Sequence, residues 1–337
     1  MISVVAAAQR SVLGPLAGDP RIVAANAAVA PLMHDAVLGL RPSMRDLALE
    51  HLGWPPEPGR PVALLGKGVR SLLALVAADM IAGTPDAGVR AAACVELVHE
   101  SGLVHDDPMD RDVVRRGRPA VWAAHGVPAA ILLGTALSTL ALQVLQDQPP
   151  EQRDRMTALW AATMQDMVVG QARDVELAEA ATDAVDPTGW EDMAERKTGA
   201  LFGAAMAMGA VTGGADAPTV TAFDRIGRLL GVAYQIEDDI LAIWGDPAVT
   251  GKPAVREPSA RLYPVVVMAD QLDPVTPGGG RTTCQQLLAG TPAQERCVAA
   301  VRRLTAEALA LLTASPDRSG SSVALRALVA SLVDRQR

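Results

Sequence analysis

The sequence predicts an all-α fold in which residues 1–337 form a single domain, an antiparallel helix bundle. Apolar residues recur with helical spacing along most of the chain, and no alternating run is long enough for a useful strand. Half of the residues are hydrophobic but only 3% are aromatic, which favours closely packed helices over a β-sandwich. The breaks between periodic segments are short and evenly spread, so no linker separates two domains.

Proline and glycine set the limits of the predicted helices. Breaks that contain these residues fall at 54–61, 82–88, 116–119, 146–150 and 274–280. Between the breaks, apolar residues three or four positions apart line one face of each segment. This periodicity predicts helices near 22–39, 65–83, 87–111, 127–147, 151–181, 188–213, 216–244, 261–271, 294–314 and 321–336.

The composition excludes several classes of protein. A net charge of −8, with no run of Lys or Arg, argues against binding to nucleic acid. The most apolar segment, 127–145, contains Gly, Ser and Thr and predicts a buried helix rather than a transmembrane span. The first residues lack a basic region ahead of their apolar stretch, so we expect no export signal. Three widely spaced cysteines, Cys94, Cys284 and Cys297, predict reduced thiols and a cytoplasmic protein.

Two clusters of carboxylates are the first indication of function. Asp106, Asp107 and Asp110 lie in HDDPMD, and Asp238 and Asp239 lie in QIEDDILAIWGD. Adjacent acids on an apolar helix are unfavourable unless a cation lies between them. Asp106 and Asp110 are four residues apart, so they share one helix face and can hold a cation together. Oxygen ligands of this kind suit Mg²⁺, which commonly binds one or two carboxylates together with substrate phosphates.

The residues around the acids indicate a diphosphate ligand. His99 lies two helical turns before Asp106, and Arg115 and Arg116 follow the acids after one loose turn. Guanidinium groups can hold the phosphate oxygens that the metal does not bind. In the second cluster, Gln235 faces the same way as the two aspartates. If both helices line one cavity, the site suits ionisation of a diphosphate ester, with cations stabilising the departing pyrophosphate.

Lysine is rare in this chain. Lysine and arginine total 30 residues, and only Lys67, Lys197 and Lys252 are lysines. Lysine binds phosphate as a point charge, whereas arginine is a planar fork, so the two are not equivalent. Each lysine adjoins Gly, Thr or Pro, in GKGVR, ERKTG and VTGKP. We therefore predict that these lysines bind phosphate.

From about residue 60 to 260, the chain resembles the trans-isoprenyl diphosphate synthases (polyprenyl synthetases), in particular bacterial geranylgeranyl diphosphate synthases. The motifs that carry the resemblance are GKGVR (66–70), HDDPMDRDVVRRGRPAVW (105–122), GQARD (170–174), ERKTGALF (195–202) and YQIEDD (234–239). The resemblance implies a helix bundle around a central cavity, three Mg²⁺ ions per active site and a homodimer. It also implies an electrophilic condensation of isopentenyl diphosphate with an allylic diphosphate.

The same resemblance implies a role for each matching residue. Isopentenyl diphosphate is expected at Lys67, Arg70, His99 and Arg116. Other substrate contacts are expected at Arg115, on the allylic diphosphate, and at Lys252, Ser101, Gly102 and Gln171. The residues expected to act in catalysis are Asp106, Asp110, Lys197, Thr198, Gln235 and Asp238. The expected metal ligands are Asp106, Asp107, Asp110, Asp238 and Asp239.

Four places depart from the family's pattern. Ala242 replaces the last acid of the second acidic motif, although Asp246 is retained. Ser71 stands where proline is usual. Pro108 lies inside the first acidic motif, where it removes a helix hydrogen bond and should distort that turn. The segment 253–264 is shorter than usual and has no lysine, and its charged residues include Glu257 and Arg261.

Small residues one turn before the acids predict a long product. Gly102 and Ser101 precede Asp106 by four and five residues, and a helix rises about 1.5 Å per residue, so they lie deeper along the growing tail. Neither is an aromatic plug. We therefore expect geranylgeranyl diphosphate or a longer all-trans product rather than farnesyl diphosphate.

Three alternatives remain open at this stage. A diverged class I terpene cyclase, or an unusual prenyl transferase, would share the fold and the first acidic motif but would need no isopentenyl diphosphate site. A non-catalytic subunit of a heteromeric synthase would be expected to have lost acids from that motif, and these are intact. The pair His105–Asp106 also occurs in HD-type metal phosphohydrolases, although only five histidines are present to support such a site.

Overall fold

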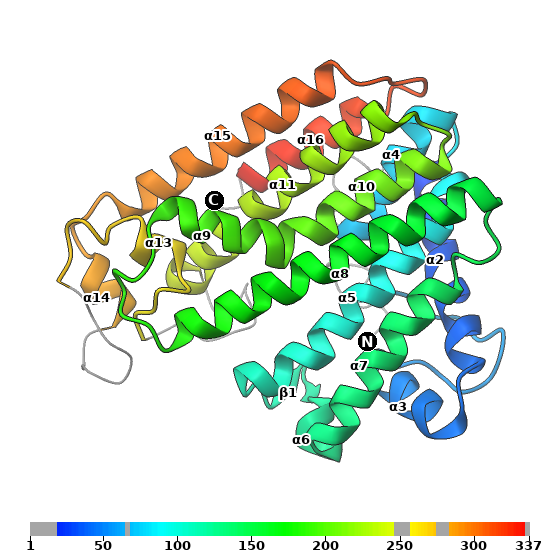
Figure 1. The fold of residues 1–337 in the computed structure, drawn as a ribbon, viewed down its shortest axis with the longest axis horizontal. Coiled ribbons are helices and arrows are strands. Elements are labelled where there is room, and N and C mark those ends of the chain that lie inside the picture. Colours follow the sequence, from blue (N-terminus) through cyan, green and yellow to red (C-terminus); the bar gives the residue numbers. More distant parts are fainter. Residues whose placement is uncertain (1–18, 65–67, 246–256, 274–282, 334–337) are drawn as a thin grey trace. The chain divides into compact units, whose positions relative to one another are not determined.

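The computed structural model describes residues 19–64, 68–245, 257–273 and 283–333, and these are mostly helical (Figure 1). The longer helices are α2 (Pro20–Leu38), α3 (Pro42–Leu52), α4 (Val69–Ala82), α5 (Val89–Asp110), α7 (Val127–Gln143), α8 (Pro150–Ala178), α9 (Pro187–Ala194), α10 (Ala200–Thr212), α11 (Ala217–Trp244), α15 (Ala293–Thr313) and α16 (Ser322–Val333). The shorter helices are η2 (Pro85–Gly88), α6 (Val121–His125), η3 (Glu195–Gly199), α13 (Tyr263–Val266) and α14 (Cys284–Leu288). Among the described residues only β1 (Val114–Arg115) and β2 (Arg118–Pro119) are strands, and they pair antiparallel. The predicted all-α fold is confirmed.

The helices differ most from the predicted ones at three places, and the short helices α6 and α14 are also not predicted. The periodicity does not predict α3, which has Pro42 in its first turn and ends at Gly53, whose φ of 63° closes the helix. The predicted helix 188–213 is interrupted by η3, which is π-helical. The predicted helix 261–271 is wrong in extent, because only α13 is helical there and turns follow it.

The described residues divide into two compact units. Unit 1 contains those within 1–161, 204–221 and 316–325, and unit 2 contains those within 162–203, 222–315 and 326–337. The single-domain organisation stays a prediction.

The acidic helix α5 is at the centre of unit 1, where it packs against α2, α4 and α7. The side chains from Ser71 to Ile81 on α4 are all buried. α5 and α7 approach so closely that a Cβ on Gly134 would lie 2.2 Å from Nε2 of His105. Figure 1 shows the two helices running side by side. This packing fixes the end of α5 that carries the first acidic cluster.

Unit 2 holds the largest buried aromatic side chains. Trp190, Phe202 and Phe223 are fully buried, and the rings of Trp190 and Tyr263 lie 4.8 Å apart. A second core cluster includes Ile243, the last buried residue of α11, together with side chains of 265–293. The second acidic cluster therefore lies between two packed regions of the same unit.

Within the described ranges, none of the helices is both long and apolar enough to span a bilayer. Cys94, Cys284 and Cys297 are buried free thiols. Burial raises the pKa of Cys94 to about 12 and that of Cys284 to about 11, so both remain protonated near neutral pH.

Candidate active site

The end of α5 presents two aspartates at its surface and buries a third. Asp106 and Asp110 are partly exposed and one turn apart, whereas Asp107 is 1% exposed. Successive residues of a helix point about 100° apart, so Asp106 and Asp107 face different sides. The helix passes through Pro108 and continues to Asp110, where Arg111 adopts a φ of 58° and closes it.

Asp107 anchors Arg115. Nε of Arg115 donates to Oδ1 of Asp107 at 2.8 Å, and Nη2 of Arg115 donates to the same oxygen. Arg115 also pairs with Asp112 at 3.2 Å. Oδ2 of Asp107 is buried and accepts no hydrogen bond from the described residues, so within them the carboxylate keeps an unused acceptor. The structure thus joins a predicted metal ligand to a predicted diphosphate ligand.

Arg116 is held by a buried carboxylate, that of Glu100, which also contacts His51. The sequence patterns identify neither Glu100 nor His51. Nη1 and Nη2 of Arg116 donate to the two oxygens of Glu100 at 2.9 and 2.7 Å. Nε2 of His51 lies 2.9 Å from Oε2 of the same carboxylate. Burial alone would raise the pKa of Glu100, but Arg116 and His51 outweigh it and hold that pKa well below its usual value. The sequence signal that could have identified Glu100 is an acid on a helix face that is expected to be buried, because a buried carboxylate requires a partner.

Arg70, at the start of α4, lies beside His99, in the middle of α5. Nη1 of Arg70 is 3.5 Å from Nε2 of His99. Burial, reinforced by the charge of Arg70, lowers the pKa of His99 well below its usual value, so His99 is neutral near pH 7. Oε1 of Glu96 accepts the backbone N–H of Ser71 at 2.9 Å. A proline in place of Ser71 would have no N–H to donate, so this hydrogen bond to Glu96 depends on the departure from the family's pattern. Lys67 lies outside the described residues.

Ser101 and Gly102, which are expected to lie along the path of the growing product, are beside α7. Ser101 is buried, and its hydroxyl donates to the carbonyl oxygen of Gly134 at 2.7 Å. Gly102 is partly buried. Both residues lie about one turn before Asp106, as the sequence predicts. Ser101 is therefore fixed against a neighbouring helix by its own hydrogen bond.

In unit 2, Lys197 and Thr198 lie on the π-helical segment η3. Gly170 of α8 contacts this segment so closely that a Cβ there would lie 2.3 Å from the backbone N of Lys197. Gln171 follows on α8 and is partly buried. Single π-helical turns are rare and are often found at functional sites.

Asp174, on the same helix α8, accepts hydrogen bonds from two cations. Nζ of Lys197 lies 2.6 Å from Oδ2, and Nε of Arg261 lies 3.0 Å from Oδ1. Nη2 of Arg261 also donates to Oδ2. Burial would raise the pKa of Asp174, but Arg261 and Lys197 outweigh it and lower that pKa. Asp174 is the last residue of the GQARD motif, but the sequence pattern predicts no role for it.

Hydrogen bonds connect η3 to the acidic part of α11. Thr198 Oγ1 donates to Oε1 of Gln235 at 3.0 Å, and Nε2 of Gln235 donates to Oδ1 of Asp239 at 3.2 Å. Oδ2 of Asp239 accepts the backbone N–H of Tyr263 at 2.9 Å. Burial raises the pKa of Asp239 to about 7 despite these donors. Asp238, in contrast, is partly exposed.

These side chains line a pocket of about 500 Å³ in unit 2. The charged and polar side chains at its wall include Asp174, Lys197, Gln235, Asp239, Glu257 and Arg261. The shortened segment after the second acidic motif therefore contributes directly to the pocket. Lys252 of that region lies outside the described residues.

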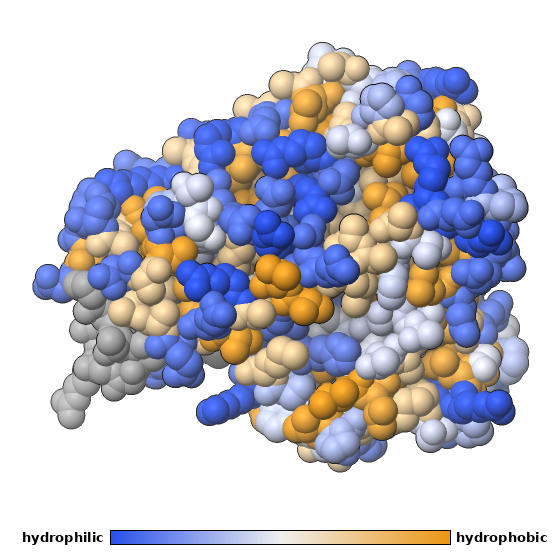
Figure 2. Space-filling view, in the orientation of Figure 1, coloured by the Kyte–Doolittle hydropathy of each residue, from blue (hydrophilic) through white to orange (hydrophobic). Residues whose placement is uncertain are grey.

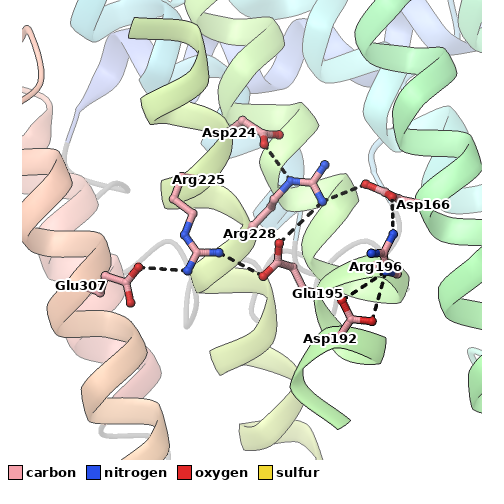
Figure 3. A network of polar contacts seen from close by, with 8 residues as sticks. All are labelled: Asp166, Asp192, Glu195, Arg196, Asp224, Arg225, Arg228 and Glu307. Atoms are coloured by element: carbon pink, nitrogen blue, oxygen red, sulfur yellow. Dashed lines mark hydrogen bonds and ion pairs between the residues drawn. The ribbon is translucent and has the colours of Figure 1, made fainter. Parts of the chain in front are cut away.

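An ion-pair network braces η3 beside this pocket (Figure 3). Arg228 of α11 pairs with Asp224 at 2.7 Å and with Asp166 of α8 at 2.9 Å. Arg196, the residue before Lys197, pairs with the same Asp166 at 3.1 Å. The other members shown are Asp192, Glu195, Arg225 and Glu307. The network thus fixes the backbone that carries Lys197.

The donors on α5 fit a Mg²⁺ ion that substrate completes. In the described part of the chain, no three His, Cys, Asp or Glu side chains gather as a metal site. Asp106 and Asp110 offer two oxygen ligands one turn apart, and Mg²⁺ is commonly bound by one or two carboxylates plus substrate phosphates. The unused oxygen of Asp107 lies on the same turn. The oxygen-only chemistry of this set therefore suits the ion.

Comparison with known proteins identifies the family. A sequence model of the family described as polyprenyl synthetase matches residues 59–263. The chain is 39% identical over 244 residues to (2E,6E)-farnesyl diphosphate synthase of Mycobacterium tuberculosis, an alignment that covers 72% of this chain and 67% of that one. It is 37% identical over 260 residues to geranylgeranyl diphosphate synthase of the same organism, covering 75% and 72%.

A solved structure supports the same assignment. The crystal structure of polyprenyl synthetase from Streptomyces coelicolor A3(2) superimposes with a TM-score of 0.78 and 30% identity, covering 92% of this chain and 99% of that one. The family match spans both acidic clusters and reaches Tyr263. The chain therefore belongs to the polyprenyl synthetase family.

Proposed function

We propose that this protein is a Mg²⁺-dependent trans-prenyltransferase that condenses isopentenyl diphosphate with an allylic diphosphate. The observation that carries the proposal is the end of α5, where Asp106 and Asp110 are partly exposed and the buried Asp107 anchors Arg115. Oxygen ligands for a cation and a guanidinium for phosphate thus belong to one short segment. The names of the relatives support the same activity, because they are diphosphate synthases.

The proposed metal ligands are Asp106, Asp107, Asp110, Asp238 and Asp239, for three Mg²⁺ ions. When bound, Mg²⁺ supplies the positive charge that favours loss of pyrophosphate from the allylic substrate. Arg115 and Lys197 hold the oxygens of the allylic diphosphate. Gln171 and Lys252 are proposed as further substrate contacts.

Isopentenyl diphosphate is assigned to Arg70 of α4, His99 of α5 and Arg116 of the turn between β1 and β2. Arg70 and Arg116 supply guanidinium donors, and Lys67 is expected to add an ammonium group. Neutral His99, beside Arg70, offers a ring N–H or a lone pair but no charge. Glu100 keeps Arg116 in place through two hydrogen bonds.

The proposed reaction breaks the bond between C1 and oxygen of the allylic diphosphate and leaves an allylic carbocation. The double bond of isopentenyl diphosphate then forms a new bond to C1, and a proton leaves the product to the departing pyrophosphate. Thr198 and Gln235, hydrogen-bonded to each other, present oxygen dipoles that can stabilise the cation. A largely apolar environment would protect the cation from water.

The proposed product is geranylgeranyl diphosphate or longer, because neither Ser101 nor Gly102, one turn before Asp106, is an aromatic residue that could block a growing chain. The relatives include both farnesyl and geranylgeranyl diphosphate synthases, so their names leave the length open. Ser101→Phe is expected to shorten the product by at least one five-carbon unit, measured by chromatography of the dephosphorylated products. Gly102→Phe provides a second test at a partly exposed position. If both variants fold and the product keeps its length, the prediction that Ser101 and Gly102 set the product length is wrong.

The deciding assay incubates the purified protein with Mg²⁺, isopentenyl diphosphate and one allylic diphosphate of five, ten or fifteen carbons. Chain elongation that requires both substrates is the expected result. Consumption of an allylic diphosphate without isopentenyl diphosphate would instead select a terpene cyclase. No turnover of any substrate would favour a non-catalytic synthase subunit.

A homodimer is part of the proposal. On α7, the large apolar side chains Val127, Ile131 and Leu132 are 44%, 52% and 57% exposed. Figure 2 shows apolar surface over the N-terminal part of α7. A second copy would cover this face, and sedimentation of the purified protein tests it. We further place the protein in the cytoplasm, on the basis of its three free thiols.

A further inference from the structure

The pocket of unit 2 contains a carboxylate that is shared by two cations from distant parts of the chain. Asp174 is 4% exposed and accepts from Lys197 at 2.6 Å and from Arg261 at 3.0 Å. The side chains of Lys197 and Arg261 are 22% and 27% exposed, so both cations reach the open side of the pocket. One buried anion thus holds two partly exposed cations at the wall of a cavity.

The position of Arg261 is built by its neighbours. Its carbonyl oxygen accepts the indole N–H of the fully buried Trp190 at 2.9 Å. Its N–H donates to Oγ of Ser259 at 3.2 Å. Two residues later, the N–H of Tyr263 donates to Asp239, and its ring packs on Trp190. Backbone contacts on both sides therefore hold Arg261 in place independently of its side chain.

Arg261 also comes from the segment in which the lysine expected from the family's pattern is missing. Within the described residues 257–264, it is the one cationic residue. Its guanidinium lies on the same carboxylate as Lys197, which the proposed function assigns to the allylic diphosphate. A group that shares an acceptor with Lys197 is within reach of the same anion.

We infer that Arg261 is a further ligand of the allylic diphosphate, and that Asp174 holds Arg261 and Lys197 side by side until the diphosphate binds. This inference rests on the proposed function. The planar fork of arginine can give two parallel hydrogen bonds to phosphate oxygens, whereas lysine acts as a point charge. The pair therefore offers one orienting and one purely charged contact to the same substrate group.

Other charges that line the pocket are consistent with an anionic ligand that brings cations of its own. Glu257 is exposed at the pocket wall, and Asp239 lies inside it. A bare anion would be repelled by these carboxylates, but a diphosphate that carries Mg²⁺ would place positive charge beside them. The ligand expected here is thus a metal-bound diphosphate.

The test measures ligand affinity by calorimetry in the presence of Mg²⁺, with the full-length protein. The probes are geranyl thiolodiphosphate, an unreactive allylic analogue, and isopentenyl diphosphate. Arg261→Gln is expected to weaken binding of the analogue about tenfold to a hundredfold, the usual loss for a charged hydrogen bond. Binding of isopentenyl diphosphate should change less than twofold. Asp174 keeps Lys197 as a partner in this variant, so the fold should persist.

Two further variants make the result specific. Arg261→Lys retains the charge but loses the fork, and is expected to fall between wild type and Arg261→Gln. Arg296→Gln removes another partly exposed arginine of unit 2, which pairs with Asp270 at a different pocket. It should bind the analogue like the wild type, so a general effect of losing one positive charge is excluded.

The outcomes separate the inference from the proposed function. If the wild type elongates substrates and Arg261→Gln binds the analogue with wild-type affinity, the inference is wrong and the proposed function stands. An equal loss of affinity for both probes would also overturn the inference, because Arg261 would then act through the fold. If the wild type binds neither probe, the proposed function fails and the inference fails with it.

Discussion

The two acidic clusters carry similar residues in different electrostatic environments. At the end of α5, an arginine pairs with the buried Asp107, and Asp106 and Asp110 remain partly exposed. On α11, Asp239 is buried among neutral donors, and burial raises its pKa to about 7. Asp238 beside it is partly exposed.

The difference lies in the charge of the partner. A buried carboxylate next to a guanidinium is stabilised as an anion, whereas neutral N–H donors only partly offset the loss of water. Glu100, which pairs with Arg116, belongs to the first kind, and its pKa is lowered despite burial. We conclude that the acids of α5 are organised by cations of the chain itself. Asp239 would need an added cation to be fully ionised at neutral pH.

The largest expected effect distinguishes Asp106, a partly exposed acid of α5, from the buried Asp107. Asp106→Asn should lower kcat/KM on the order of 10³-fold, because it removes a proposed metal ligand, and should lower the free energy of unfolding less than Asp107→Asn does, because Asp106 is partly exposed. Asp107→Asn should lower the free energy of unfolding by about 2 kcal/mol as well, because Arg115 loses its partner. Steady-state kinetics and urea unfolding measure both. Asp154→Asn, at a surface ion pair, is the control.

A comparison in which Asp106→Asn destabilised the fold as much as Asp107→Asn would contradict the division of roles. It would mean that the partly exposed acid also supports the structure of α5.

The next largest effect tests whether cations organise unit 1. Glu100→Gln should lower the free energy of unfolding by about 3 kcal/mol at pH 7, because Arg116 and His51 lose a buried anion. The folded-state pKa of Glu100 lies below its usual value of 4.5. Its contribution is therefore fully present above that value and is lost as the pH falls below it. Urea unfolding at pH 7 and pH 4 should show the difference between wild type and variant shrinking.

The matched control for this variant is Glu50→Gln, since Glu50 pairs with His125 at an exposed position. It should change the free energy of unfolding by less than about 0.5 kcal/mol. A Glu100→Gln difference that stayed constant down to pH 4 would show that the charge of Glu100 is not what stabilises unit 1.

Much of the fold and of the candidate site follows from local patterns in the sequence. The spacing of apolar residues predicts the all-α class, and the spacing of Asp106 and Asp110 predicts their common face. It does not predict which neighbouring acid is buried, because that depends on how α5 lies against α2, α4 and α7. The π-helical turn of η3 also has no periodic signal, since it spans only five residues.

The contacts that organise each cluster come from residues distant in sequence. His51 meets Glu100 across 49 positions, and Arg261 meets Asp174 across 87. No motif spacing encodes such pairs, because they depend on the folded positions of separate helices. An unexplained buried acid is the sequence signal that could have directed attention to Glu100 and Asp174.

Unit 2 is expected to depend on close helix packing as well as on its ion pairs. Gly170→Ala would place a Cβ 2.3 Å from the backbone N of Lys197. The helix α8 or η3 must then shift, which should cost about 2 kcal/mol in the free energy of unfolding and lower kcat/KM about tenfold. Gly39→Ala is the control, because its nearest neighbour would lie at 3.2 Å. Full activity in Gly170→Ala would show that η3 tolerates displacement.

The smallest expected effect concerns the network that braces η3 (Figure 3). Arg228 is 17% exposed in its side chain and pairs with Asp224 and Asp166, whereas Arg225 is 43% exposed. Arg228→Gln should therefore lower the free energy of unfolding by about 1 kcal/mol, and Arg225→Gln by less, because exposed pairs contribute little. If the network positions Lys197, Arg228→Gln should also raise KM for the allylic diphosphate a few-fold while KM for isopentenyl diphosphate stays constant. Equal changes in both constants would indicate that the network only stabilises the fold, and that Gly170 alone sets the position of η3.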